Sequence, residues 1–437
     1  MHFKKGRSQT AISKTVHRAF AAAGVGVLIA TLAVAVESRG ADLRSTPLFD
    51  GERTALHTGA VINYWGGAFS PGSTAGITLQ GDVVHSGDGA YRIDLAPTAP
   101  GQFGFFQTFS SELKGQLQRS TRDLTSFEMF ETYVRNDTGA PFDLVLEIKD
   151  YRDSNSQRAQ RTFAIPAGGW TKVSTPLSLT SGWSVSGTPQ LDRTYALSFL
   201  VKPTVATLSG PIYFDDARLI EPGGPLDPLT APIGEVAEAL ARRTFLGMWG
   251  ARNRETSLVP NVSTDADAGA LNTTSGVVWA LPSAVRRGWV SASDADAYMS
   301  KLADSLNANL DQTTYLPTRF LGLSTGGPLG GGEESPVDAA FLALGLHQYK
   351  SQPGVDASLA SKLDAVENRF DFSALASSNG WRLNYVPGSG LSGGTYSGYT
   401  TEGKVISLAA ALSDSHPVAL SQLWNSDTYR TVASLVD

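Results

Sequence analysis

The chain has 437 residues, of which 41% are hydrophobic and 17% charged, a composition that excludes an intrinsically disordered protein and allows two globular domains. The net charge of -6, with no long run of lysine and arginine, argues against a nucleic-acid-binding surface, so we expect no nucleic acid as a partner. Because there is no cysteine, disulfides, thiol nucleophiles and cysteine-ligated metals are excluded.

The N-terminal segment, residues 1–41, has the pattern of an export signal. Five lysines and arginines precede the apolar run from Ala19 to Val36, and Ala33 and Ala35 form an Ala-x-Ala pair typical of a cleavage site. The run is also near the minimum length of one membrane span, so an uncleaved signal anchor is the alternative to a signal peptide. The pattern predicts an exported bacterial protein, secreted or periplasmic, with no membrane contact except through this segment.

Residues 45–221 predict an all-β domain. Short runs alternate in polarity or are rich in β-branched and aromatic residues, as in AYRIDL from Ala90, DLVLEIKDY from Asp143 and YALSFLVKP from Tyr195. Turn sequences such as SGDG from Ser86 separate these runs. Many short strands at this spacing favour an antiparallel sandwich of the size of a jelly roll.

Two stretches of this domain, SGDGAYRIDL (86–95) and IYFDDARL (212–219), resemble the jelly-roll carbohydrate-binding modules attached to bacterial glycoside hydrolases. In such modules an aspartate of the last strand often holds a structural calcium ion, a role that would correspond to Asp215 or Asp216 here. Aspartate and backbone oxygens would suffice for such a hard cation. The alternative is that both aspartates are ordinary polar strand residues, and no cofactor is expected for catalysis.

Tyr64 and Trp65, in the sequence NYWGG, are candidate sugar-stacking residues of this domain. Aromatic faces pack on the apolar patches of sugar rings. The alternative for each of them is a place in the core, because the aromatic side chains of strands are usually packed inside.

The segment 222–229, PGGPLDPL, is typical of a domain boundary because it is rich in proline and glycine. After it the apolar residues follow helical spacing, and we expect about six helices and no strand in residues 230–437. The expected helices contain or span residues 236–243, 274–287, 298–310, 336–349, 357–370 and 402–412.

A glycine-rich loop within this region, GGPLGGGEESPVDAAFLALGL (326–346), leads into an apolar helix. Glu333 and Glu334 stand between three glycines and the start of the helix, where a purely structural loop more often uses Asp, Asn or Ser. Asp338 follows Ser335 by three residues and therefore also fits a capping box, which is the structural alternative to a functional role. A helix that is apolar on all sides is buried, so carboxylates at its start face the cleft that the loops enclose.

A second loop, YSGYTTEGKVISLAAALSDSHP (396–417), repeats this plan with Glu402 in the first turn of its helix. The helix dipole favours a negative charge at that position, so a dipole role alone is the alternative.

The helical region resembles the bacterial glucoamylase-like proteins, an (α/α)6 group that includes endo-β-1,2-glucanases. The stretches that carry the resemblance are ETSLVPN (255–261), TTSGVVWALPSAVRRGWVS (273–291), ESPVDAAFLALG (334–345) and residues 398–417. The resemblance implies a glycoside hydrolase with a toroid of paired helices. Residues 230–437 are too few for six helical hairpins, so we expect an incomplete toroid, its first half.

Hydrolysis of a glycosidic bond needs one protonated carboxyl group and one carboxylate. The resemblance implies an inverting mechanism with Glu402 as general acid and with Asp338 or Glu334 as the base or as an acid that positions the substrate. Whether the chain is an enzyme stays open at this stage, because a non-catalytic glycan-binding protein and a structural protein of exopolysaccharide export fit the same features.

Residues expected to contact sugar in the helical region are Trp381, Tyr396, Tyr399 and Glu333. The partner implied by both resemblances is a polysaccharide or oligosaccharide, with a β-glucan favoured.

Overall fold

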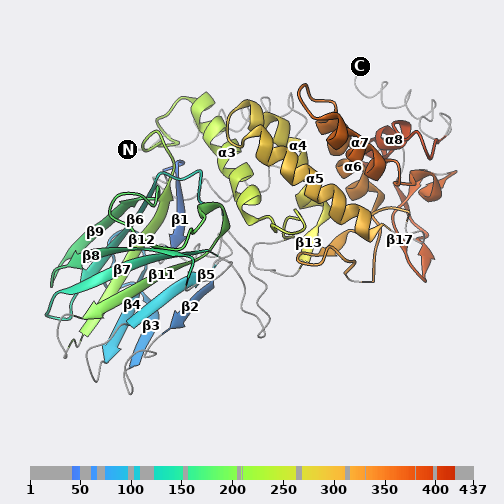
Figure 1. Ribbon diagram of the computed structural model, residues 1–437. Helices are drawn as coiled ribbons and strands as arrows, with labels where there is room; N and C mark the ends of the chain where they lie inside the picture. Colours follow the sequence, from blue (N-terminus) through green and yellow to red (C-terminus); the bar gives the residue numbers. More distant parts are fainter. Residues whose placement is uncertain are drawn as a thin grey trace, which may run out of the picture.

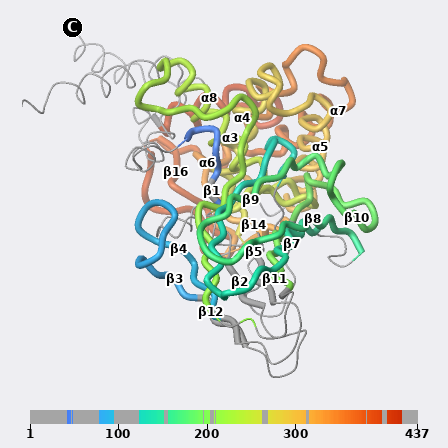
Figure 2. The backbone as a smooth tube through the Cα atoms, turned by 90° about the vertical axis from the view of Figure 1, so that its left-hand side faces the viewer, coloured from blue at the N-terminus to red at the C-terminus, as the bar shows by residue number. Residues whose placement is uncertain are grey.

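The computed structural model describes residues 42–49, 61–65, 74–96, 103–108, 123–150, 156–203, 208, 210–261, 268–310, 315–329, 331–378, 380–396 and 401–418. The predicted signal segment 1–41 lies outside them. The described chain forms a β-rich part followed by a helical part (Figure 1). Figure 2, turned by 90°, shows the strands in front of the helices.

The β-rich part contains two six-stranded antiparallel sheets. Its strands are β1 (Ser45–Phe49), β2 (Val61–Trp65), β3 (Thr74–Gln80), β4 (Ala90–Ala96), β5 (Phe103–Thr108), β6 (Met129–Asn136), β7 (Phe142–Asp150), β8 (Arg158–Ile165), β9 (Trp170–Pro176), β10 (Ser184–Ser186), β11 (Thr194–Pro203) and β12 (Gly210–Ile220). One sheet has the order β3-β4-β12-β6-β9, with β1 paired to β12, and the other has the order β10-β8-β7-β11-β5-β2.

The two sheets pack face to face through apolar side chains. Phe199 of β11 contacts Phe130 of β6 and Phe214 of β12, with ring centroids 5.7 and 5.9 Å apart. In β6 the buried Phe130 and Val134 alternate with Tyr133 and Arg135, which are half-buried on the other face, as the two-residue period of a strand requires. The antiparallel sandwich expected from the sequence is therefore present.

The described part of the chain contains six α-helices, all after residue 232. They are α3 (Ile233–Ala251), α4 (Leu271–Arg286), α5 (Ala292–Asn309), α6 (Pro336–Lys350), α7 (Ala357–Glu367) and α8 (Thr401–Ala411). The hydroxyl groups of Ser291 and Ser335 accept hydrogen bonds from the backbone N–H of Asp294 and Asp338, so both capping serines begin helices where the sequence predicts them. Among the described helices, none has both the length and the hydropathy needed to cross a bilayer.

Helix α6 lies at the centre of the helical part and packs against α4, α7 and α8. Ten of its fifteen residues are buried, which explains why its sequence is apolar on nearly every side. The toroid inferred from the resemblance is not confirmed by these six helices and stays a prediction.

The expectation of a helical part without strands is wrong. Seven short strands connect and flank the helices: β13 (Ala268–Ala270), β14 (Phe320–Gly322), β15 (Ala376–Ser377), β16 (Gly380–Arg382), β17 (Tyr385–Val386), β18 (Gly390–Leu391) and β19 (Thr395–Tyr396). Each has only two or three residues, too few to display an alternating pattern of polarity. These short pairings fix the loops that carry the candidate site.

Charged side chains join the β-rich part to α3, which lies between the sandwich and the other helices (Figure 1). Near the first half of the helix, Arg242 forms an ion pair with the buried Glu221 at the end of the β-rich part. Just after the helix, Arg252 and Arg254 lie 3.8 and 3.5 Å from a carboxylate oxygen of Asp123. Both side chains of the Arg252–Asp123 pair are largely buried, so this contact is shielded from solvent.

Candidate active site

Two loops, one before α6 and one after α7, pair through Glu334, which forms β-bridges with Thr318 on one side and with Tyr385 on the other. Glu334 and Tyr385 exchange backbone hydrogen bonds of 2.8 and 3.1 Å. Neighbouring residues of paired strands point to opposite sides. The side opposite the Glu334 side chain is shared by Arg319, Glu333 and Asn384.

Arg319 lies between two carboxylates on this side. Its Nε is 3.4 Å from Oδ2 of Asp338, and its Nη1 is 4.0 Å from Oε1 of Glu333. Asn384 donates a hydrogen bond of 3.0 Å from Nδ2 to the same Glu333 oxygen. The Arg319 side chain is 43% exposed and that of Asp338 is 12% exposed, so the arginine is the more solvent-exposed partner of this ion pair.

Tyr396 and Glu402 belong to the same site. Tyr396 is half-buried in β19, and burial, followed by the negative charges of Glu402 and Asp338, raises the pKa of its phenol. Glu402 is exposed in the first turn of α8, and its charge also acts on Asp338. The sequence prediction therefore brought together four residues that the structure also brings together: Glu333, Asp338, Tyr396 and Glu402.

Asp338 is the buried member of this group. Burial raises the pKa of Asp338, and the charges of Glu333 and Glu402 raise it further, whereas the Ser335 hydrogen bond and the Arg319 charge lower it. The balance leaves the pKa above the ordinary value of an aspartate. An elevated pKa makes the carboxylate a stronger base, which is the property needed to take a proton from water.

Glu334 lies away from this group. Its side chain is completely buried, and Oε2 accepts hydrogen bonds of 3.0 and 2.9 Å from the backbone N–H groups of Tyr315 and Leu316. Two backbone donors hold this completely buried carboxylate inside the loop. This placement corrects the prediction of a catalytic role and gives Glu334 a structural one.

Trp381 is also a core residue, which corrects its prediction as a sugar-stacking side chain. Its ring is only 2% exposed, and Nε1 donates a hydrogen bond of 3.1 Å to Oγ of Ser407 on α8. Tyr399 lies outside the described residues, so its predicted sugar contact stays a prediction.

In the β-rich part, Tyr64 and Trp65 lie in β2, where their backbones pair with Phe105 and Gly104. The position of their side chains lies outside what the structure describes, and their stacking role stays a prediction.

Asp215 and Asp216 occupy an irregular point of β12, where the pairing with β6 shifts. Asp215 is completely buried, and Oδ2 accepts hydrogen bonds of 2.7 and 3.2 Å from the backbone N–H groups of His85 and Ser86. Burial is the main reason that the pKa of Asp215 rises to about 6. Oδ2 of Asp216 lies 2.6 Å from Nδ1 of His85, whose ring stacks on Tyr133 at 3.5 Å.

The partners of these two carboxylates in the described part of the chain include hydrogen-bond donors of His85 and Ser86. N–H and O–H donors occupy the carboxylate oxygens that a cation would need, and the described residues hold no group of three or more His, Cys, Asp or Glu side chains arranged to bind a metal ion. The structural calcium predicted at Asp215 or Asp216 therefore has no support from this geometry and stays an untested prediction.

Sequence analysis did not single out Arg319 or Asn384. A signal for Arg319 was available, because it is the only charged residue between 312 and 332. No comparable signal marks Asn384, whose contact with Glu333 depends on the pairing of two distant loops.

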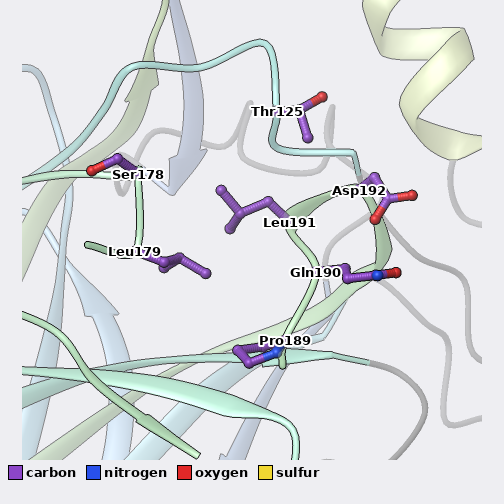
Figure 3. A pocket seen from close by; sticks show the side chains of 7 residues that line it. All are labelled: Thr125, Ser178, Leu179, Pro189, Gln190, Leu191 and Asp192. Carbon is purple, nitrogen blue, oxygen red and sulfur yellow. The ribbon is translucent and has the colours of Figure 1, made fainter. Parts of the chain in front are cut away.

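An open depression of about 510 Å³ lies elsewhere, on the β-rich part. Its lining consists of Thr125, Ser178, Leu179, Pro189, Gln190, Leu191 and Asp192. Figure 3 shows Leu179 and Leu191 pointing toward each other, with Asp192 on the side nearer to a helix. The depression contains none of the predicted site residues.

No family model matches the sequence, and none of the curated proteins matches it. Solved structures similar to the chain include a glucoamylase candidate from Bacteroides caccae, with 21% identity over 44% of this chain and a TM-score of 0.38. A β-1,2-glucanase from Parabacteroides distasonis has 12% identity over 91% of this chain and 72% of its own, with a TM-score of 0.41. A family 11 carbohydrate-binding module from Clostridium thermocellum has 16% identity over 40% of this chain and 95% of its own, with a TM-score of 0.29.

These similar structures fall into the two classes that the sequence motifs resemble, carbohydrate-binding modules and glucoamylase-like proteins. The chain spans about half the length of the Bacteroides caccae protein, 51%.

Proposed function

We propose that the chain is an exported glycoside hydrolase that acts on a polysaccharide, with a β-glucan as the favoured substrate. The observation that supports this proposal is that Asp338 at the start of α6 contacts Arg319, and that the charges of Asp338 and of Glu402 at the start of α8 both act on Tyr396. A carboxyl pair of this kind is the minimum requirement for hydrolysis of a glycosidic bond.

In the proposed reaction, the carboxyl group of Glu402 donates its proton to the glycosidic oxygen as the bond from that oxygen to the anomeric carbon breaks. Asp338 accepts a proton from a water molecule, and the oxygen of this water forms the new bond to the anomeric carbon from the opposite face. The product has the inverted configuration, and both carboxyl groups regain their starting states by exchange with solvent. Glu333 and Tyr396 are proposed to contact the sugar.

The experiment that tests the proposal is release of reducing ends from linear β-1,2-glucan by the purified chain, with β-1,3-, β-1,4- and α-glucans alongside. The proposal predicts cleavage of at least one β-glucan, with the inverted anomer as the first product in a proton NMR time course. If no glucan is cut but one is retained in affinity electrophoresis, the enzyme proposal fails and a glycan-binding protein takes its place.

A further inference from the structure

The charge of Arg319 acts on both Asp338 and Tyr396, and so does the negative charge of Glu402. The Arg319 guanidinium lies 3.4 Å from Asp338 and 4.0 Å from Glu333. The surrounding loop contributes no other charge, since residues 312–332 contain no second one.

The backbone that carries this guanidinium is held by two hydrogen bonds. The N–H of Arg319 donates a 2.6 Å hydrogen bond to the carbonyl oxygen of Glu333, and its carbonyl oxygen accepts one of 3.1 Å from the N–H of Leu271 at the start of α4. The guanidinium also lies 5.1 Å from the ring centroid of Phe320. A cation held by the loop itself can orient a neighbouring carboxylate, whereas a mobile surface arginine would gain little from such a contact.

We propose that Arg319 is a positioning residue, which holds Asp338 in its ionised form and aims it at the attacking water. The negative charge of Glu333 disfavours the ionised form of Asp338, as does that of Glu402 when its carboxyl group is ionised, whereas the charge of Arg319 favours it. Arg319 relieves this repulsion at Asp338 by direct contact. Asn384 stabilises the Glu333 carboxylate by a hydrogen bond from its neutral amide. The guanidinium of Arg319 can therefore contact Asp338. The catalytic meaning of this role rests on the proposed hydrolase function, but the coupling of Arg319 to Asp338 does not.

The coupling is tested by a double-mutant cycle of Arg319→Gln and Asp338→Asn in the full chain, with urea unfolding followed at pH 7 and at pH 4. Because burial raises the pKa of Asp338 above its unfolded value, the ionised carboxylate costs stability as the pH rises, and this cost vanishes below the unfolded pKa. We expect Asp338→Asn to raise the urea midpoint at pH 7 more in the Arg319→Gln background than in the wild type. At pH 4 this difference should shrink. Additive effects at both pH values would overturn the proposal.

The catalytic consequence is tested by the pH dependence of kcat/KM. Loss of a cation at this distance should raise the pKa of Asp338, so the acidic limb of the profile should move upward by about one pH unit in Arg319→Gln. In Arg319→Lys the acidic limb should lie close to its wild-type position, because lysine keeps the positive charge. Arg382→Gln is the matched control: it removes the same charge from β16, where the side chain donates a hydrogen bond to the carbonyl oxygen of Ser392, and it should leave the acidic limb in place.

An unmoved limb in Arg319→Gln would overturn the catalytic role even if the stability cycle shows coupling. If the wild type cleaves no glucan, the hydrolase proposal fails, and the stability cycle alone decides whether Arg319 holds Asp338 ionised.

Discussion

Glu333 and Glu334 are adjacent in the chain and have opposite environments. The Glu333 side chain is 31% exposed, accepts a hydrogen bond from Asn384 and lies near Arg319. The Glu334 side chain is completely buried and is held by two backbone N–H groups on the other side of the paired loops. Because neighbouring residues of a paired segment point to opposite sides, Glu333 belongs to the candidate site and Glu334 to the core.

Replacing Glu334 with alanine should destabilise the protein by about 2–4 kcal/mol, because the buried N–H of Leu316 and the partly buried N–H of Tyr315 lose their acceptor. Glu334→Gln, which keeps one acceptor oxygen, should cost less, and Glu333→Gln should have almost no effect on stability because that side chain is partly exposed. Urea unfolding measures all three. A fully stable but inactive Glu334→Gln variant would contradict the structural assignment and return Glu334 to the catalytic candidates.

The activity should fall toward acidic pH with a midpoint above the ordinary aspartate pKa of about 3.9. Burial and the charges of Glu333 and Glu402 raise the pKa of Asp338, and only the ionised form can accept a proton from water, so the rate is lost as the pH falls through this raised value. A profile of kcat/KM against pH checks the prediction. An acidic limb at or below the ordinary value would mean that another group acts as the base.

Gly345 should tolerate no side chain, because α4 and α6 approach each other closely at this point. A Cβ atom at Gly345 would lie 2.9 Å from Cγ1 of Val278 and 3.3 Å from Cδ1 of Trp279. We expect Gly345→Ala to destabilise the fold by about 1–3 kcal/mol. Gly247→Ala in α3 is the matched control: a Cβ there meets nothing within 4 Å, and the higher helix propensity of alanine should stabilise the protein by about 0.5–1 kcal/mol. Equal effects in thermal unfolding would contradict the packing described here.

The ion pairs of Asp123 should contribute to the attachment of the β-rich part to α3. Asp123→Ala leaves the largely buried Arg252 without its carboxylate partner, so we expect a loss of about 2–3 kcal/mol. Asp94→Ala removes a pair with Arg92 that is exposed on both sides and should have no measurable effect. Limited proteolysis in the linker 222–229 should accelerate in the first variant only. Unchanged cleavage there would show that other contacts hold the two parts together.

The sequence predicts the helices well because their signals are local. Ser291 and Ser335 cap helices through residues three positions ahead, and the apolar spacing of each helix lies within its own sequence. The longer strands β4, β7 and β11 of the sandwich are likewise visible as runs in the sequence, whereas β10 has only three residues. The acidic residues at the start of α6 and α8 could therefore be placed at one end of the helical part from the sequence alone.

The remaining features depend on contacts between distant segments. Glu333 and Glu334 point to opposite sides because Glu334 pairs with Thr318 and Tyr385, and no local pattern encodes this pairing. Trp381 lies in β16, and its ring is enclosed by Ser407 and the helical core, which are contacts that no local pattern reveals. Asp216 contacts His85 across 131 residues of sequence, so no local pattern could predict this hydrogen bond.

The most direct test of the central claim compares the wild type with Glu402→Gln on the glucan that the wild type cleaves. Both the release of reducing ends and retention in affinity electrophoresis should be measured. The account predicts that Glu402→Gln loses cleavage by about 10²–10⁴-fold, as expected for removal of a general acid, and still retains the glucan. Lys404→Gln, two residues along the same helix, should cleave as the wild type does. Cleavage by Glu402→Gln at the wild-type rate would contradict the account.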